Sequence, residues 1–282
     1  TWELDLGETE LIKTSPVLTD VNNDGKIEVI VGYDDASGSL NLRAYSPILS
    51  CGLTGWSPGG THMDELLWSW SDPDLAISRP SPSPSISISG HRPTTQLLLA
   101  DIDHDGVDEI LMSVWNQANE EINVLALDLG TTPPTSPIWA ASLDQGTHPS
   151  DPAYVKTDPS TGYVLITTTD SSTGAVWLWK LNGANGNEAW SPRSMGNTDG
   201  DSNVPHVRMP GPIVANLDSD AALEVVVTIP TDLGGTGNAD GAEYRALEVT
   251  DGQTELWSVN AIDGYADAPP LPVDKDEDLS LI

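Results

Sequence analysis

The sequence predicts an all-β protein built from repeated units of four antiparallel strands. Apolar residues nowhere keep the spacing of an amphipathic helix, and Gly, Pro, Ser, Thr and Asp interrupt the chain every few residues. Short apolar runs rich in β-branched residues instead predict strands at 27–31, 97–100, 164–168 and 223–229. These runs recur in a fixed order, which indicates copies of one structural unit.

Each unit is expected to contain a short apolar strand, an acidic loop, a second strand, a third strand, a turn that carries Gly, and a fourth strand marked by Trp. The third strands are expected at 42–45, 124–128, 176–182 and 246–249. The markers are Trp68 or Trp70, Trp139, Trp190 and Trp257. They lie about 50 to 70 residues apart, the size of a four-stranded propeller blade with its insertions. The pattern therefore predicts a β-propeller.

We expect residues 1–282 to form a single propeller domain or part of a larger one, with four units at about 14–71, 93–142, 148–192 and 205–259. Residues 1–6 are typical of the last strand of a preceding unit, and 268–282 of the first strand and loop of a following one. The propeller would thus have about four to five blades in this chain and be incomplete at both ends. Either the two ends share one blade, or a copy of this chain or another polypeptide supplies the missing strands. Residues 76–96 form a Ser/Pro-rich insertion, expected to be a surface loop.

The composition excludes several classes of partner. The chain has 43 acidic and 11 basic residues and a formal net charge of -32, so it lacks the basic clusters that nucleic acid and anionic lipid require. No apolar run approaches the roughly 20 residues of a membrane span. Cys51 is the single cysteine, which excludes an internal disulfide and a cysteine-zinc site. An acidic excess of this size is suited to binding divalent cations, or to keeping the chain soluble in salty water, where the self-repulsion is screened.

The acidic loops between the first and second strands share one spacing. Oxygen-bearing side chains stand at loop positions 1, 3, 5 and 9, Gly stands at position 6 in the first two loops, and the main-chain carbonyl of position 7 offers one more oxygen. The expected ligands are Asp20, Asn22, Asp24, Lys26 and Glu28 in the first unit, Asp101, Asp103, Asp105, Val107 and Glu109 in the second, and Asn216, Asp218, Asp220, Ala222 and Glu224 in the fourth.

This spacing indicates calcium. In a tightly curled loop alternate side chains turn inward, and a shell of about 6 to 8 oxygen atoms suits Ca²⁺ better than Mg²⁺ or a transition metal. Asp, Asn and Gly also cluster in ordinary turns. Three loops in register favour metal over turns, because the carboxylates would otherwise repel one another.

Two further acidic segments differ from these loops. Asp274, Asp276 and Asp278 form a fourth candidate that lacks the Gly and the acid at position 9. The third unit has only residues 158–162 at this place, which predict a plain turn. His104 stands at a position of the second loop that supplies no ligand, and we expect it to face solvent.

Residues 20–31, 101–111 and 216–226 resemble the calcium loops of FG-GAP/VCBS repeats, which occur in integrin α-subunit propellers and in secreted microbial proteins. The Trp-ended hairpins are similar to the quinoprotein-like propeller repeat. The resemblance implies structural calcium that clamps one edge of a blade, and a surface used for adhesion, carbohydrate contact or assembly. The chain departs from the family in lacking Phe, which the literal FG-GAP signature needs, and in its third unit.

The sequence favours a structural function. None of the five His residues stands in a paired metal motif, and no Gly-x-Ser-x-Gly elbow or phosphate-binding Gly-rich loop occurs. We therefore assign no catalytic residue and no organic cofactor. The hypothesis is a secreted or cell-surface module, stabilised by Ca²⁺ in at least three loops, that contacts protein or glycan or assembles into surfaces or filaments. The rival hypothesis is a secreted polysaccharide lyase or hydrolase on the same scaffold.

Overall fold

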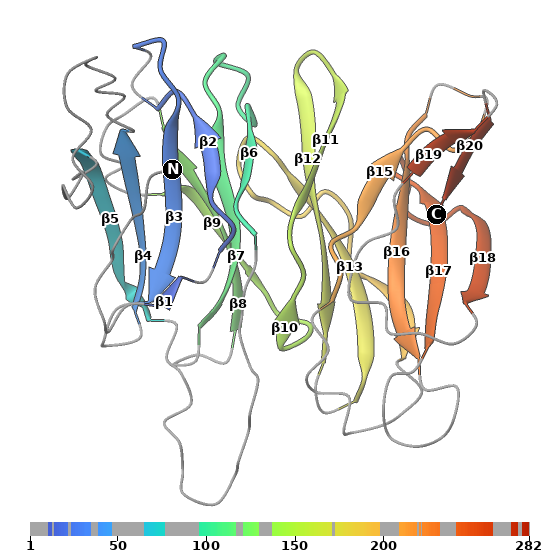
Figure 1. The fold of residues 1–282 in the computed structure, drawn as a ribbon. Helices are drawn as coiled ribbons and strands as arrows, with labels where there is room; N and C mark the ends of the chain where they lie inside the picture. The colour runs from blue at the N-terminus through green and yellow to red at the C-terminus, as the bar shows by residue number, and fades with distance from the viewer. Residues whose placement is uncertain are drawn as a thin grey trace, which may run out of the picture.

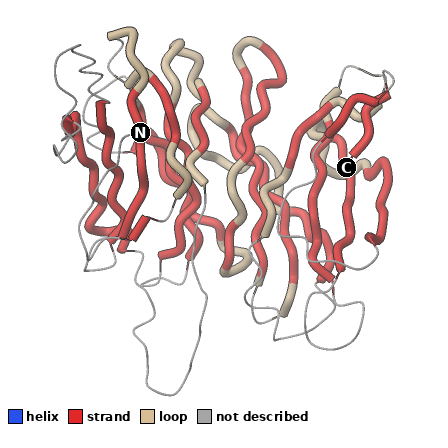
Figure 2. Tube along the Cα trace, in the orientation of Figure 1, coloured by secondary structure: helices blue, strands red, loops and turns tan. Residues whose placement is uncertain are grey.

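The computed structural model confirms the all-β class. It describes residues 11–12, 14–21, 24–34, 39–46, 65–76, 96–116, 121–129, 137–170, 173–197, 209–218, 220, 222–231, 241–261, 272–275 and 278–281. These residues form strands and loops and no helix (Figure 2). None of their segments is therefore a helix that could span a membrane. Residues 1–6 and most of the Ser/Pro-rich insertion lie outside the described residues.

Unit 1 is a five-stranded antiparallel sheet. Its strands are β1 (Leu11–Ile12), β2 (Val17–Thr19), β3 (Glu28–Asp34), β4 (Ser39–Ser46) and β5 (Glu65–Ala76). The order is β1-β3-β4-β5, and β2 also pairs with β3. The β-branched run predicted at 27–31 thus lies almost entirely in β3, a largely buried strand in the middle of the sheet.

Units 2 and 4 are four-stranded sheets with the same connectivity. Unit 2 contains β6 (Leu98–Ala100), β7 (Glu109–Asn116), β8 (Glu121–Asp128) and β9 (Pro137–Leu143). Unit 4 contains β15 (Ile213–Ala215), β16 (Glu224–Thr231), β17 (Gly241–Glu248) and β18 (Glu255–Ala261). In each unit the strands follow one another in sequence order across the sheet. The wide loop from the first to the second strand is the predicted acidic loop.

Unit 3 has the same framework with a divided first strand. It contains β10 (His148–Pro149), β11 (Ala153–Asp158), β12 (Thr161–Thr169), β13 (Ala175–Asn182) and β14 (Arg193–Asn197). Both β10 and β11 pair with β12. Because β11 continues as far as Asp158, only a tight turn joins it to β12. A separate hairpin of β19 (Pro272–Lys275) and β20 (Asp278–Leu281) follows unit 4.

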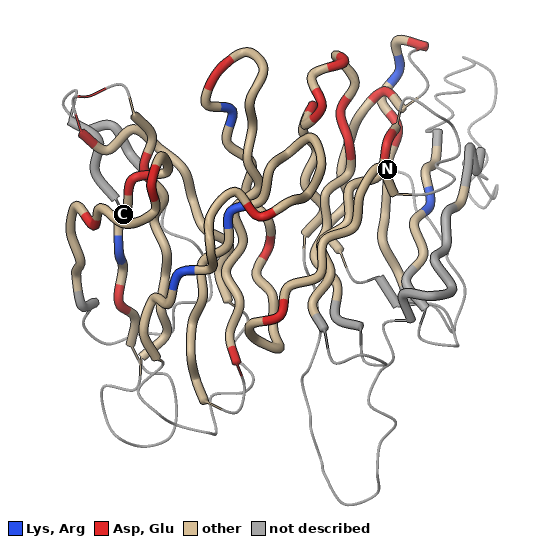
Figure 3. Tube along the Cα trace, turned by 180° about the vertical axis from the view of Figure 1, so that it is seen from behind, with Lys and Arg blue, Asp and Glu red and all other residues tan. Residues whose placement is uncertain are grey.

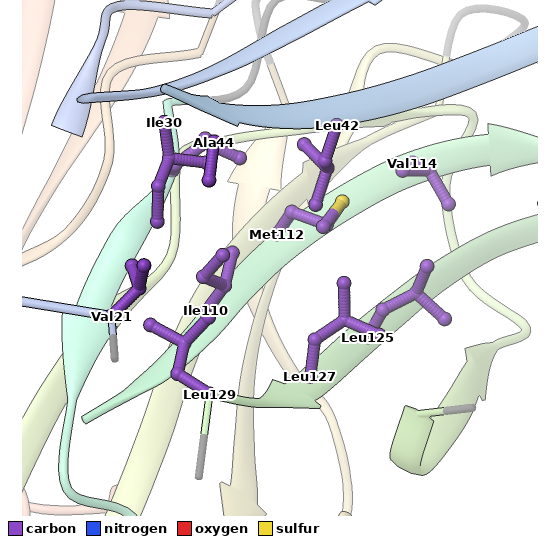
Figure 4. Packing of buried hydrophobic residues seen from close by; sticks show 11 residues of the cluster. Val21, Ile30, Leu42, Ala44, Ile110, Met112, Val114, Leu125, Leu127 and Leu129 are labelled. Carbon is purple, nitrogen blue, oxygen red and sulfur yellow. The ribbon is translucent and has the colours of Figure 1, made fainter. Parts of the chain in front are cut away.

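The four sheets stand side by side and pack face to face (Figure 1). Side chains of a strand alternate between the two faces, so β7 serves two interfaces. Ile110 and Met112 pack toward unit 1, and Leu111 packs toward unit 3. Figure 4 shows the interface between units 1 and 2, where Ile30 and Leu42 lie against side chains of β7 and β8. The hydrophobic core is therefore a series of layers between neighbouring units.

Trp139 of unit 2 and Trp190 of unit 3 fill space between units. Trp139 lies in the fourth strand as predicted, but Trp190 precedes β14, so the prediction that it lies in the fourth strand was wrong. The Trp139 indole covers Gly186 in the turn after β13, where an added Cβ would lie 2.5 Å from the ring. The Trp190 indole covers Gly252 of unit 4 in the same way, again at 2.5 Å. Both glycines have positive φ, which glycine adopts without strain. Each Trp thus fills the contact between its own unit and the following one, a contact that we call the joint.

Candidate metal centre

The three acidic loops occupy equivalent places, between the first and second strands of units 1, 2 and 4. Acidic residues gather at these loops (Figure 3). Each loop starts after a short first strand and ends at a Glu that opens the next strand, with Ala100 paired to Glu109 and Ala215 paired to Glu224. The β-ladder therefore fixes both ends of each loop.

Carboxylates inside the loops bind the loop backbone and hold it in a tight curl. Asp20 Oδ1 accepts the N–H of Asp24 at 3.0 Å, and Asp20 Oδ2 accepts the N–H of Gly25 at 2.7 Å. The carboxylate at position 5 accepts the N–H of position 7 in every loop, with Asp24 and Lys26 at 2.9 Å in unit 1. The matching pairs are Asp105 with Val107 at 2.8 Å and Asp220 with Ala222 at 2.7 Å. Gly25 and Gly106 adopt φ of 84° and 91°, which explains the glycine at position 6.

The Glu at position 9 is buried in all three loops. Glu28, Glu109 and Glu224 are exposed by only 0%, 1% and 0%. One oxygen of each, Oε2, accepts the backbone N–H of loop position 2. The donors are Val21 at 3.0 Å, Ile102 at 2.8 Å and Leu217. Each Glu therefore ties the beginning of its loop to the strand that follows.

The second oxygen of each Glu is buried and has no hydrogen-bond partner. The Oε1 atoms of Glu28, Glu109 and Glu224 share this state with Asp101 Oδ1 and Asn216 Oδ1, the position-1 oxygens of two of the loops. An unpaired buried oxygen costs about 1–3 kcal/mol, and more if it is charged. A cation among these oxygens would remove that cost.

The oxygens converge closely enough for one ion. One oxygen from each of Asp101, Asp103 and Glu109 lies within 4.8 Å of the others, and the same holds for Asp218, Asp220 and Glu224. The donor set contains only carboxylate and amide oxygens, which suit a hard cation. The residues of units 2 and 4 therefore fit a calcium ion.

Unit 1 holds its loop differently. The Lys26 ammonium contacts Asp24 Oδ2 at 3.0 Å, so a side-chain cation already approaches one expected ligand. Asn22 lies outside the described residues, as does Ala221, which stands at the Gly position in unit 4. The unit 1 loop keeps the buried Glu28 and its unpaired oxygen.

Burial is the main reason that the pKa values of the three loop Glu residues are raised. The pKa of Glu109 is raised to about 8, mainly by burial and additionally by the charges of Asp103, Asp105 and Asp101, against the lowering effect of the Ile102 N–H. Burial is also the main reason that the pKa values of Glu28 and Glu224 are raised. Carboxyls in this environment gain strongly from a cation.

Two other expectations have different outcomes. Asp274 and Asp278 lie in the hairpin, where Lys275 pairs with Asp278 across a connection too short for the wide loop of the other units. Asp276 is outside the described residues, so the fourth site stays a prediction. The expectation that His104 faces solvent was wrong. Its backbone has a left-handed φ of 68°, and both ring nitrogens are buried without a hydrogen-bond partner.

Unit 3 has a turn where the other units have the acidic loop. Asp158 Oδ1 accepts bonds from the N–H and the hydroxyl of Ser160 at 2.8 and 2.9 Å, as in an ordinary Asx turn. Earlier in the same strand, β11, the Tyr154 hydroxyl donates to the Asp101 carbonyl of unit 2 at 3.2 Å. Unit 3 therefore contacts the unit 2 loop without forming a loop of its own.

Sequence reasoning missed Lys180, which is only 4% exposed. Its Nζ donates to the Val249 carbonyl of unit 4 at 2.6 Å and lies 3.8 Å from the Tyr163 ring and 4.6 Å from the Trp190 ring. Alignment of the third strands could have revealed it. The corresponding positions are Ala44, Ala126 and Ala246, which pair with Trp68, Trp139 and Trp257.

No protein family matches this sequence, and no curated protein matches it. Solved structures similar to it include the PilY1 C-terminal domain of Pseudomonas aeruginosa, with 16% identity and a TM-score of 0.45 over 86% of this chain and 49% of that one. An exo-β-1,3-galactanase of Clostridium thermocellum gives 13% and 0.38 over 89% and 51%. A GH43 β-1,3-galactosidase gives 14% and 0.37 over 89% and 75%. The chain thus spans about half the length of the first two.

Proposed function

We propose that this chain is a calcium-stabilised β-propeller module of the cell exterior, used for contact with protein or glycan or for assembly. One observation carries the proposal. Three loops in equivalent places each bury a Glu with one oxygen bonded to the loop and the other unpaired. A calcium ion held by the loop oxygens would complete the hydrogen-bonding and charge balance of all three.

The position of the loops favours a structural role for the metal. Each Glu lies at the first residue of a strand that packs against a neighbouring unit, and it also holds the start of the loop. A cation there would join the first strand, the loop and the second strand of one unit. Metal binding and folding would then be coupled, because the unfolded chain has no such site.

The proposed contact function rests on the surface and on the resemblance to FG-GAP/VCBS repeats. The net charge of -32 favours partners that tolerate or bind an acidic surface with its cations. Calcium loops repeated along one end of a row of units give a rigid and extended face. Protein, glycan or further copies of the chain are the proposed partners of that face.

A polysaccharide lyase or hydrolase on this scaffold is the rival. Most glycoside hydrolases need a pair of carboxyl groups about 5 to 10 Å apart, on either side of the bond that breaks. Among the described residues, the clustered metal-type carboxylates are those of the acidic loops, whose Glu residues are anchored to the loop backbone. That arrangement is better suited to holding a cation than to attacking a substrate.

The test is thermal unfolding with calcium and with excess EGTA, together with a count of bound metal by mass spectrometry. We expect calcium in the loops of units 1, 2 and 4 and a large fall in melting temperature on chelation. No bound calcium and no change in melting temperature would overturn the proposal. Release of reducing or unsaturated sugar from a panel of polysaccharides would favour the rival, whereas calcium-dependent self-association in sedimentation would favour an assembly module.

A further inference from the structure

The third strands of units 2 and 4 place a second acidic residue opposite the loop Glu. Glu109 pairs directly with Asp128, and Glu224 pairs directly with Glu248. Directly opposed residues of an antiparallel pair project from the same face, with Cβ atoms about 4.5 to 5.5 Å apart. The loop therefore shares this face with one more carboxylate than its own spacing supplies.

Such a pair is unfavourable without a cation. Like charges directly opposite one another destabilise a sheet, and here one member of each pair is fully buried while the other is partly buried. Glu248 raises the pKa of Glu224 beyond the effect of burial, and Asp220 and Asp218 do the same to Glu248. The Glu248 carboxylate thus belongs to the electrostatic environment of the unit 4 loop.

Unit 3 provides an internal comparison. In unit 3 Thr167 N donates to Ser150 Oγ at 3.0 Å, as Gly32 N donates to Thr14 Oγ1 at 2.9 Å in unit 1, so these positions correspond.

Four residues before Gly32 stands Glu28, and four residues before Thr167 stands Tyr163, which pairs with Asn182. The unit without a metal loop therefore has a neutral pair where units 2 and 4 have two acids.

Unit 1 shows the intermediate case. Val29 pairs with Tyr45, so the position opposite Glu28 is Ser46, which carries no charge. The additional acid is thus present in two of the three units that have an acidic loop. In those same two units the oxygen of position 1 is also buried and unpaired, alongside that of the loop Glu.

We propose that Asp128 and Glu248 each contribute a further carboxylate to the cation sites of units 2 and 4. This inference rests on the proposed calcium function and deepens it, because it names ligating groups that lie outside the loops. In unit 4 the additional carboxylate offsets the neutral Asn216 at position 1. The sites of units 2 and 4 then bind calcium more tightly than the site of unit 1.

The experiment measures calcium binding to Asp128→Asn and Glu248→Gln by native mass spectrometry and titration calorimetry, with Asp144→Asn as the control. Asp144 is an exposed carboxylate of unit 2 away from the loop, and its replacement removes the same charge. We expect each test variant to bind calcium roughly 10–100-fold more weakly at one site, the other sites remaining as in the wild type. The control should match the wild type.

Wild-type affinity at every site in both test variants would overturn the inference while leaving the calcium function in place. A wild-type protein that binds no calcium would instead overturn the proposed function itself. Melting temperatures in EGTA separate a ligand from a merely repulsive neighbour. A carboxylate that only repels would raise the melting temperature on neutralisation and leave the calcium affinity unchanged, which would also contradict the inference.

Discussion

Units 2 and 3 have the same antiparallel framework, but they connect their first and second strands in different ways. Unit 2 joins its first two strands by the acidic loop and places the buried Glu109 at the start of β7. Unit 3 joins them by the tight turn after Asp158, with Tyr163 at the position of Glu109. Under the proposed function, the first arrangement takes its cation from solution, whereas the second is complete with the protein's own groups.

The contacts of units 2 and 3 with the unit that follows each of them also differ, in the side chain that donates to the equivalent carbonyl of the next unit. Trp139 of unit 2 donates from Nε1 to the Gly183 carbonyl of unit 3 at 2.7 Å. The equivalent acceptor after unit 3 is the Val249 carbonyl, which receives Lys180 Nζ instead, and Trp190 Nε1 is buried without a partner. The unit without an acidic loop therefore brings a side-chain cation into its contact with the next unit. Under the proposed function, one copy of the repeat is stabilised by an external ion and the next copy by an internal charge.

The largest expected effect is on the pH dependence of the calcium-free protein. The folded-state pKa of Glu109 is raised to about 8 from 4.5, so the folded protein binds more protons than the unfolded chain between these values. The contribution of Glu109 to stability should therefore be fully present below pH 4.5 and be lost as the pH rises through 8, a fall of roughly 4 kcal/mol. Urea unfolding in chelator across this range measures the slope, and Glu109→Gln should flatten it.

The control for this slope is Glu188→Gln, which neutralises an exposed carboxylate of unit 3. It should keep the wild-type slope. Because Glu28 and Glu224 are also raised, Glu109→Gln should retain part of the dependence. An unchanged slope in Glu109→Gln would show that the unit 2 loop does not differ from the unit 3 turn in this respect.

Replacing the glycine under either Trp, Gly186 under Trp139 or Gly252 under Trp190, should destabilise the protein by a similar amount. In Gly186→Val a Cβ would meet the Trp139 ring at 2.5 Å, on a backbone with φ of 70°. The overlap and the strain of a β-branched residue at positive φ should together cost about 3 kcal/mol. Gly252→Val, with φ of 62° and the Trp190 ring at the same 2.5 Å, should cost a similar amount.

Gly106→Val, measured in chelator, separates the cost of overlap with a Trp ring from the cost of backbone strain at positive φ. The φ of Gly106 is 91°, and an added Cβ would have no heavy atom within 4 Å. This variant should therefore be destabilised by backbone strain alone. Chemical unfolding of the three variants gives the comparison. An equal loss in all three would show that the Trp contacts contribute nothing beyond the turn geometry.

The strands and the loops could be predicted from sequence because their signals are local. The spacing of oxygen side chains in residues 101–109 and the β-branched run of residues 27–31 lie within single segments. The burial of Lys180 and the bond from Tyr154 to Asp101 depend on residues 69 and 53 positions away. Lys180 also follows Trp179 in an alternating strand, where a charged residue is expected to face solvent. Only the stacking of units shows which positions are enclosed.

Lys180→Ala tests the polar part of the unit 3 joint. Burial lowers the pKa of Lys180 to about 8 from 10.5, against the opposing charge of Asp251. The folded protein therefore binds fewer protons than the unfolded chain between these values. Wild-type stability should gain roughly 2–3 kcal/mol from this group as the pH rises through that range, and lose it as the pH falls through 8.

The Ala variant has the residue that the other units carry at this position and leaves the Val249 carbonyl to Trp190. It should fold and lose this slope, as measured by urea unfolding at several pH values. Lys156→Ala, at an exposed lysine of unit 3, should keep the slope. If the pH dependence of stability persisted in Lys180→Ala, the buried Lys180 would not be its cause, and its role as the internal cation between units 3 and 4 would be contradicted.

The smallest effect is expected for Tyr154→Phe, which removes the one hydroxyl by which unit 3 holds the Asp101 carbonyl of the unit 2 loop. The loss of a single neutral hydrogen bond should cost about 1 kcal/mol in urea unfolding. Because Asp101 is an expected ligand, the loss should be accompanied by weaker calcium binding in unit 2 and unchanged binding in unit 4. Tyr244→Phe, in the third strand of unit 4, should change neither quantity. If Tyr154→Phe lowered stability without affecting calcium, the contact would be only a joint between the two units, and the metal loop of unit 2 would be independent of its metal-free neighbour.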